Sequence, residues 1–230
     1  MATVLVTGAN RGIGLEFVRQ LLGRSDRVIA SCRNSAAAAD LQTLKFENPA
    51  LELLQLDVTS NESIDQFATS LQGAAIDIFI NNAGIYGPRD SHFGNVTGRS
   101  WATVMQVNAI APLLLTQALI DNFSRAEEKK LVYITSKMGS IEDNQGGGSY
   151  VYRSSKSALN AVVKSIAVDL GREGFSAAVL HPGWVRTDMG GVNALIDTQT
   201  SVSGMLSVID NLDANNTGSF FNYDGTIIPW

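Results

Sequence analysis

The chain alternates short apolar runs with longer stretches in which apolar residues recur at helical spacing. Several short runs are apolar without alternation, as in strands that are covered on both faces. This pattern predicts a parallel sheet with helices on both faces, an α/β doubly wound fold of the Rossmann type. The expected strands are residues 3–7, 27–32, 51–57, 76–80, 130–135 and 175–180, with a shorter one at 219–222, and the expected helices are 12–22, 36–46, 61–71, 99–123, 152–171 and 201–212. Because no repeat or linker interrupts the pattern, we expect one domain over residues 1–230.

Composition excludes several classes of protein. With 45% hydrophobic and 17% charged residues, the chain can bury a core. A net charge of −5 without a basic run argues against nucleic acid or an anionic membrane as a partner. One cysteine excludes an internal disulfide, and with only two histidines no metal site is expected.

The sequence also carries no sign of a membrane segment. The first residues lack the basic and apolar regions of a signal peptide. The most apolar stretch, residues 110–120, is broken by Pro112, Thr116 and Gln117 and is too polar to cross a bilayer. We therefore expect a cytoplasmic protein.

A glycine-rich turn follows the first expected strand. Residues 7–14 read Thr-Gly-Ala-Asn-Arg-Gly-Ile-Gly, and a helix comes next. Glycine allows the backbone to approach a ligand closely, and a helix N-terminus presents free N–H groups to phosphate. The turn therefore indicates a dinucleotide site, although its spacing differs from G-x-G-x-x-G and an ordinary strand–helix turn is the alternative.

The residues at the end of the second expected strand indicate which dinucleotide is bound. An acidic residue that binds a ribose 2′-hydroxyl is expected there, but residues 31–34 read Ser-Cys-Arg-Asn. Arg33, and Arg11 in the glycine turn, are suited to a 2′-phosphate, which favours NADP(H) over NAD(H) as cofactor. The alternative is a pair of solvated surface arginines.

A tyrosine and a lysine four residues apart open a helical segment. Tyr152 and Lys156 share one helix face, and a lysine charge beside a phenol lowers its pKa. The alternative is a surface pair. Tyr150 is nearby, but only Tyr152 has a lysine four residues on. Among the neighbouring serines, Ser136 directly follows the fifth strand, at the sheet edge where ligands bind in such folds.

Taken in order, these motifs resemble the short-chain dehydrogenase/reductase family. T-G-x-x-x-G-x-G, the Asn-Asn-Ala-Gly tetrad at residues 81–84, Ser136 and Tyr152-x-x-x-Lys156 occur in the order typical of that family. Residues 32–34, 181–191 and 222–226 resemble its C-factor and sniffer-type carbonyl reductase branch. The resemblance covers essentially the whole chain.

The resemblance implies a role for each residue. Tyr152 would be the general acid/base, Lys156 would lower its pKa and hold the nicotinamide ribose, Ser136 would steady the substrate oxygen, and Asn108 would help to maintain a proton-relay water. Dinucleotide-binding elements would lie mainly in residues 1–110 and catalytic and substrate elements mainly in 108–230. The implied cofactor contacts are Gly8, Asn10, Arg11, Gly12, Ile13, Gly14, Arg33, Asn34, Asp57, Val58, Asn81, Ala83, Gly84, Tyr152, Lys156, Pro182, Gly183, Val185 and Thr187. From the residues alone, Asp57 could equally cap the loop after the third strand.

The expected activity is hydride transfer between NADP(H) and a small-molecule carbonyl or alcohol. The alternative is a C-factor-like signalling or cofactor-sensing protein in which dinucleotide binding matters more than turnover. Residues 104–120 and 158–170 are apolar nearly all round, which favours a homodimer or homotetramer built on these helices. An apolar, fairly open pocket is expected around Tyr86, Phe93, Met138, Trp184 and Trp230.

One backbone distortion is also expected. Pro112 has no N–H, so the carbonyl of Asn108 loses its usual helical partner and the helix should kink there. We expect an ordered water near Lys156 to bind that carbonyl, and a bend that serves packing alone is the alternative.

Overall fold

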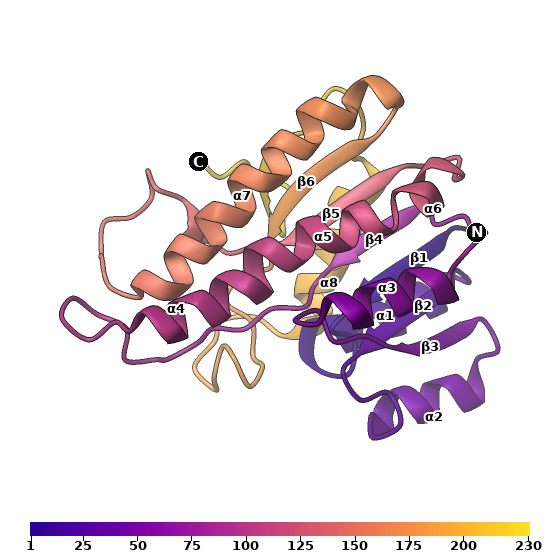
Figure 1. Ribbon diagram of the computed structural model, residues 1–230, viewed down its shortest axis with the longest axis horizontal. Helices are drawn as coiled ribbons and strands as arrows, with labels where there is room; N and C mark the ends of the chain where they lie inside the picture. Colours follow the sequence, from indigo (N-terminus) through magenta and orange to yellow (C-terminus); the bar gives the residue numbers. More distant parts are fainter.

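A computed structural model describes residues 1–230 and shows one parallel sheet of seven strands in the order β3-β2-β1-β4-β5-β6-β7 (Figure 1). The strands are β1 (Thr3–Thr7), β2 (Arg27–Cys32), β3 (Leu51–Gln55), β4 (Ile78–Asn81), β5 (Lys130–Ile134), β6 (Ser176–His181) and β7 (Ser219–Asn222). The chain winds outward from β1 to β3, returns to β4 beside β1, and then continues to β7. This reversal between β1 and β4 confirms the doubly wound fold.

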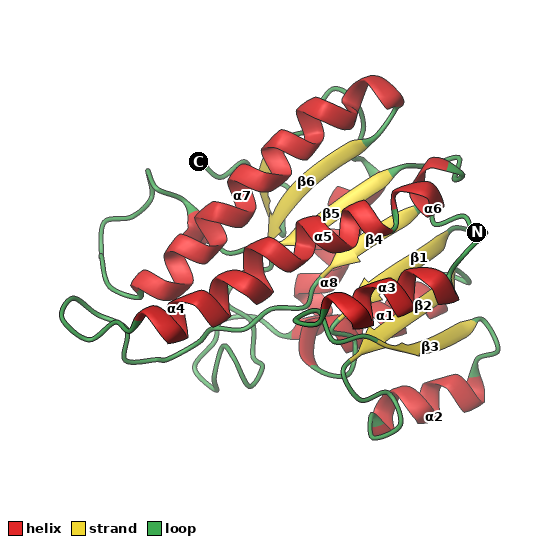
Figure 2. Ribbon diagram, viewed as in Figure 1, coloured by secondary structure: helices red, strands yellow, loops and turns green.

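Helices cover both faces of the sheet (Figure 2). One face packs on α1 (Gly12–Gly23), α2 (Ala39–Glu47) and α8 (Thr198–Asp210). The other packs on α3 (Asn61–Ser70), α5 (Ala111–Ala118), α6 (Ile120–Ser124) and α7 (Tyr150–Leu170). Helix α4 (Gly98–Met105) lies against α7. No helix is long and apolar enough to span a bilayer.

The two apolar clusters explain why the strands lack polar alternation. In β1, Val4 and Val6 pack into the core under α1 and α8, whereas Leu5 packs into the core under α3, α5 and α7. All three side chains are fully buried. A strand that is buried on both faces gains from apolar residues at every position, which is the pattern that the sequence displays.

The long helix expected at residues 99–123 is several pieces. A π-helical turn, η1 (Gln106–Ile110), separates α4 from α5, and Leu119 separates α5 from α6. In η1 the N–H of Ala111 donates to the carbonyl of Gln106, five residues back. Pro112 stands directly after this turn and cannot donate to Asn108. The expected distortion at this place is confirmed, in the form of a π-turn.

Other differences are small. The second helix begins at Ala39, three residues later than expected, and α7 begins at Tyr150, two residues earlier. A short 3-10 turn, η2 (Lys137–Gly139), follows β5, and a second, η3 (Gly171–Glu173), follows α7. Because α7 starts before Tyr152, that residue lies inside the first helical turn and not at its edge.

Candidate active site

The expected site residues follow the carboxyl ends of neighbouring strands. In the sheet β1, β4, β5 and β6 stand side by side and run parallel, so the loops that follow them meet at one edge. The glycine turn comes after β1, the Asn-Asn-Ala-Gly tetrad ends β4, and Ser136 comes after β5. The topology therefore gathers motifs that lie far apart in the sequence.

The β1–α1 turn needs glycine at two positions. Gly8 has φ of 63°, and a Cβ there would lie 2.9 Å from Cα of Ala83. A Cβ at Gly14 would lie 2.3 Å from the carbonyl oxygen of Gly8. A side chain at either position would collide with backbone atoms. Glycine at both positions therefore allows a tight turn whose backbone a ligand can approach closely.

Asn82 holds this turn in place. Its Nδ2 donates to the carbonyls of Thr7 and Gly8, at 3.0 Å each. The hydroxyl of Thr7 accepts from the N–H groups of Asn82 and Ala83, at 3.1 and 3.0 Å. The tetrad thus ties β4 to the end of β1. Asn82 is not among the expected site residues, although the tetrad motif contains it.

The N-terminus of α1 is open to an anion. Its N-cap residue, Arg11, makes no side-chain cap hydrogen bond, and the first turn contains no acidic residue. The free N–H groups and the positive end of the helix dipole therefore face the glycine turn. The guanidinium of Arg11 itself pairs with Asp188, from the loop after β6, and both side chains are largely exposed.

The residues expected near the adenosine end lie beside β2 and β3. Arg33 is exposed just after β2, and the next residue, Asn34, uses its Oδ1 to accept from the N–H of Ala37 at 3.1 Å. Asp57 accepts from the hydroxyl and the N–H of Thr59, and these hydrogen bonds, with the charge of Arg33, lower the pKa of its carboxyl. The alternative loop-capping role of Asp57 is therefore observed. The side chain of Val58 is buried in the core.

Tyr152 lies in the first turn of α7 and is 7% exposed. Burial raises the pKa of its phenol to about 12, against a lowering by a hydrogen bond with Ser136. The hydroxyl oxygen of Ser136 also accepts from the N–H of Met138 at 3.2 Å. Ser136 and Tyr152, sixteen positions apart in the sequence, therefore lie close enough for Ser136 to influence the pKa of the phenol.

Lys156 is 5% exposed and its Nζ donates to the carbonyl of Ile134 at 2.8 Å. The ammonium lies 5.9 Å from the centroid of the Tyr152 ring. Burial lowers the pKa of Lys156 to about 8. A Cβ at Gly84 would lie 3.6 Å from this Nζ, so the end of the tetrad lies directly beside the ammonium.

Burial has the largest effect on the pKa of the Tyr152 phenol, and the lowering expected from Lys156 stays a prediction. The shift of the phenol is upward, because burial outweighs the hydrogen bond to Ser136. The Lys156 ammonium is itself desolvated and is bonded to the Ile134 carbonyl, on the backbone of β5.

Asn108 connects the first turn of α7 to Ile85, which directly follows the tetrad. Its Oδ1 accepts from the N–H of Ile85 at 2.9 Å, and its Nδ2 donates to the carbonyl of Ile85 at 2.8 Å and to Oγ of Ser155 at 3.0 Å. Ser155 in turn donates to the carbonyl of Tyr152 at 2.8 Å. The side-chain amide of Asn108 is therefore bonded to protein groups, and the water expected at its backbone carbonyl stays a prediction. In the sequence Ser155 is one of several serines near Tyr152, and nothing there signals its full burial.

The loop after β6 closes one side of the site. A Cβ at Gly12 would contact Cγ2 of Thr187 at 3.4 Å, so this loop lies against the glycine turn. Val185 is buried and its backbone forms a bridge with Ile196. Gly183 has φ of 83° and packs against Ile196. The residues expected to touch the cofactor from this loop therefore also fix its shape.

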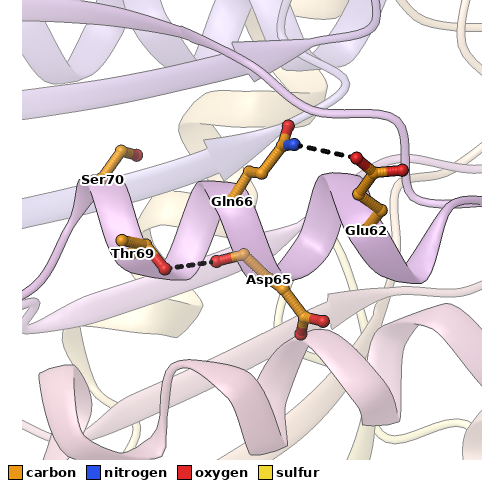
Figure 3. A pocket seen from close by; sticks show the side chains of 5 residues that line it. All are labelled: Glu62, Asp65, Gln66, Thr69 and Ser70. Carbon is orange, nitrogen blue, oxygen red and sulfur yellow. Dashed lines mark hydrogen bonds between the residues drawn. The ribbon is translucent and has the colours of Figure 1, made fainter.

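Of the aromatic residues expected to line a pocket, Tyr86 alone stacks on Tyr152, with ring centroids 4.5 Å apart. Phe93 is 86% exposed, and Trp230 packs on Phe220. A separate hollow runs along the polar face of α3, where Gln66 donates to Glu62 (Figure 3). Its lining contains none of the expected site residues.

Known proteins resemble this chain in sequence and in fold. The model of the short chain dehydrogenase family matches residues 2–194. The C-signal protein of Myxococcus xanthus is 43% identical, over 71% of this chain and 98% of that protein. The carbonyl reductase Sniffer of D. melanogaster has a TM-score of 0.96 at 33% identity over both whole chains. An NADPH-bound carbonyl reductase from chicken fatty liver has a TM-score of 0.94 at 38% identity, over 100% of this chain and 99% of that one. The chain therefore belongs to the short-chain dehydrogenase family of oxidoreductases.

Proposed function

We propose that the chain is an NADP(H)-dependent carbonyl reductase that interconverts a small-molecule carbonyl and its alcohol. One observation carries the proposal: Ser136, Tyr152 and Lys156 stand together at the carboxyl edge of the sheet, next to the glycine turn. A phenol, a hydroxyl and an ammonium in one cleft are the groups that carbonyl reduction needs for proton transfer.

The residues present fit a dinucleotide. A Cβ at Gly8 or Gly14 would fill the turn after β1, and the first turn of α1 has neither a side-chain cap nor an acidic residue. Pyrophosphate would therefore bind at this helix N-terminus. Arg33 would meet a 2′-phosphate, since no acidic residue occupies the end of β2. NADPH bound to the chicken carbonyl reductase supports the same cofactor here.

The chemistry divides between cofactor and chain. Bound NADP(H) would supply or accept the hydride at the carbonyl carbon. Ser136 donates a hydrogen bond to the substrate oxygen, and Tyr152 gives that oxygen its proton during reduction and takes it back during oxidation. Lys156, as a cation, stabilises the phenolate that remains on Tyr152. Asn108 and Ser155 hold the backbone of Tyr152 in place.

With these roles, the cofactor contacts and the substrate contacts come mainly from different parts of the chain. Residues 1–110 would supply most of the dinucleotide contacts, and residues 108–230 the catalytic and substrate contacts. We also propose a homodimer or homotetramer, since α4, η1 and α7 present the large apolar side chains of Trp101, Ile110 and Val168 to solvent. A cytoplasmic location agrees with a single, buried, unpaired cysteine, Cys32.

A second function is supported by the similarity to C-signal. In that case the chain would bind NADPH tightly and act as a signalling or cofactor-sensing protein with little turnover. Its residues Ser136, Tyr152 and Lys156 would then serve binding more than chemistry.

Turnover separates the two functions. Wild type is incubated with NADPH and a panel of aldehydes and ketones, cofactor oxidation is followed, and NADPH affinity is measured by titration. The enzyme function predicts that Tyr152→Phe lowers turnover by at least about 100-fold and leaves NADPH affinity unchanged, because only the proton donor is lost. Tight NADPH binding by wild type with no turnover of any substrate would instead favour the sensing function.

A further inference from the structure

We propose that Tyr86 is a positioning residue for Tyr152: its ring fixes the orientation of the Tyr152 ring, and its hydroxyl ties that arrangement to the start of α7. The inference rests on the proposed function only in so far as Tyr152 is the proton donor. The stacking itself is a property of the fold and can be measured without turnover.

Two separate contacts join Tyr86 to the first turn of α7. Its ring lies 4.5 Å from that of Tyr152 between centroids, at an interplanar angle of 26°. Its hydroxyl lies 3.0 Å from Oγ of Ser149, the N-cap residue of α7. Stacked aromatic pairs of this kind are stabilised beyond the effect of the area that they bury. Together the contacts hold both the ring and the helix start.

The start of α7 needs such an anchor. Ser149 has φ of 45° and ψ of 39°, a left-handed conformation that is unfavourable for a non-glycine residue. It makes no side-chain cap hydrogen bond with its own helix, so its hydroxyl is used by Tyr86. Gly147 and Gly148 precede it with positive φ, and the hydroxyl of Ser149 makes no hydrogen bond other than the one with Tyr86. The hydrogen bond between Tyr86 and Ser149 therefore fixes the start of the helix that carries Tyr152.

The residue before Tyr86 is also connected to Tyr152, through side chains that hold the Tyr152 backbone. It comes directly after Ile85, whose backbone is held at both polar groups by Asn108. Asn108 also binds Ser155, which binds the carbonyl of Tyr152. The ring of Tyr152 is thus held by Tyr86, and its backbone is held through Ser155 and Asn108, which in turn binds Ile85 next to Tyr86. Tyr86 excludes water from one face of the phenol, which agrees with the upward shift of the Tyr152 pKa by burial.

The first test observes the tyrosines directly. The chain has five tyrosines. In protein labelled with 3-fluorotyrosine, the ¹⁹F signal of Tyr152 is assigned by its loss in Tyr152→Phe. Removal of the stacked ring in Tyr86→Ala should displace this signal and lower the pH at which it titrates, because water reaches the phenol. Tyr86→Phe keeps the ring and should largely restore the position. Tyr150→Ala, which removes an exposed tyrosine without an aromatic partner, is the matched control and should leave the Tyr152 signal unchanged.

The second test uses turnover. Tyr86→Ala should lower kcat by about tenfold, since a small misplacement of a catalytic group is costly, while NADPH affinity stays unchanged. In reduction, activity should decline at a lower pH than in wild type. Tyr86→Phe and Ser149→Ala each remove the same hydrogen bond, so the double variant should be no worse than either single one.

The outcomes distinguish the two proposals. A wild type without turnover overturns the proposed enzyme function, and the ¹⁹F signals still test the role of Tyr86. A Tyr152 signal that keeps its shift and its titration in Tyr86→Ala overturns the inference, whatever the turnover. The inference also fails if kcat and its pH profile are unchanged in an active Tyr86→Ala enzyme.

Discussion

The side-chain amide of Asn108 pairs with both backbone groups of Ile85, at 2.9 Å for the N–H and 2.8 Å for the carbonyl. The amide thus makes the same pair of hydrogen bonds with Ile85 that the backbone of a neighbouring strand would make. Asn108 lies in the π-turn η1, and its exposed fraction is 1%. The widened turn carries this side chain and so connects the end of β4 with α7.

Asn108→Ala is expected to destabilise the fold by about 1–3 kcal/mol, because the N–H and carbonyl of Ile85 would be left without partners in a region that excludes water. Urea unfolding measures the change. Asn215→Ala, at an exposed turn, is the control and should have little effect. An Asn108→Ala protein as stable as wild type would contradict the role assigned to this network.

Much of the fold follows from local pattern. Strands β1, β2 and β7 have the expected bounds, because short runs with an apolar centre between turn residues have few other ways to fold. The break at η1 could be foreseen from Pro112, but its form could not. Proline removes a hydrogen bond in any helix, whereas the π-turn depends on what Asn108 meets across the fold.

The sequence predicts the site residues that belong to motifs. It does not predict the contacts that form only when distant segments pack together. Ser136, Tyr152 and Lys156 stand where strand ends and helix spacing put them. The sequence contains no signal that Ser149 adopts a left-handed conformation or that Tyr86 stacks on Tyr152. The conformation of Ser149 and the stacking of Tyr86 on Tyr152 both depend on the loop after β4 lying against the start of α7.

Lys156 should reduce stability near neutral pH. Its pKa is lowered to about 8 by burial, so between about pH 8 and its ordinary value of 10.5 the unfolded chain binds more protons than the folded one. Stability from this group therefore rises with pH across that window. Lys156→Met should raise the free energy of unfolding at neutral pH by about 1–2 kcal/mol, since the lost bond to the Ile134 carbonyl offsets part of the gain.

The advantage of Lys156→Met should shrink as the pH approaches 10.5, where wild type no longer carries the buried charge. Denaturant unfolding at several pH values measures it. Lys164→Met, which also removes a lysine of α7 bonded to a backbone carbonyl, is exposed and should give no gain. A constant difference across the pH range would show that the effect comes from packing.

The proposed oligomer should depend on the outer face of α7. Val168 is 66% exposed there, and a glutamate at this position would place a charge in an apolar interface. Light scattering at high micromolar concentration should show a dimer or tetramer for wild type and a monomer for Val168→Glu. Phe46→Glu, on α2 at the other face of the sheet, should assemble like wild type. A monomeric wild type would refute the assembly.

Cofactor preference should depend on Arg33. The residue stands at the carboxyl end of β2, where its charge reaches Asp57, and no acidic residue precedes it in that strand. A guanidinium binds a phosphate dianion with charge-assisted hydrogen bonds that are worth about 1.5–3 kcal/mol, so we expect a marked preference of wild type for NADPH.

Arg33→Asp should therefore lower kcat/KM for NADPH by roughly tenfold to 100-fold, and should improve the use of NADH, because a carboxylate can accept from a ribose hydroxyl. Arg33→Gln removes the charge without adding a repulsive one and should have a smaller effect. Arg27→Gln, at the opposite end of the same strand, breaks an exposed ion pair with Glu52 and should leave the ratio of the two cofactors unchanged. Equal efficiency of the wild type with NADPH and NADH would remove the basis for assigning Arg33 to the 2′-phosphate, because its charge would then have no phosphate to select.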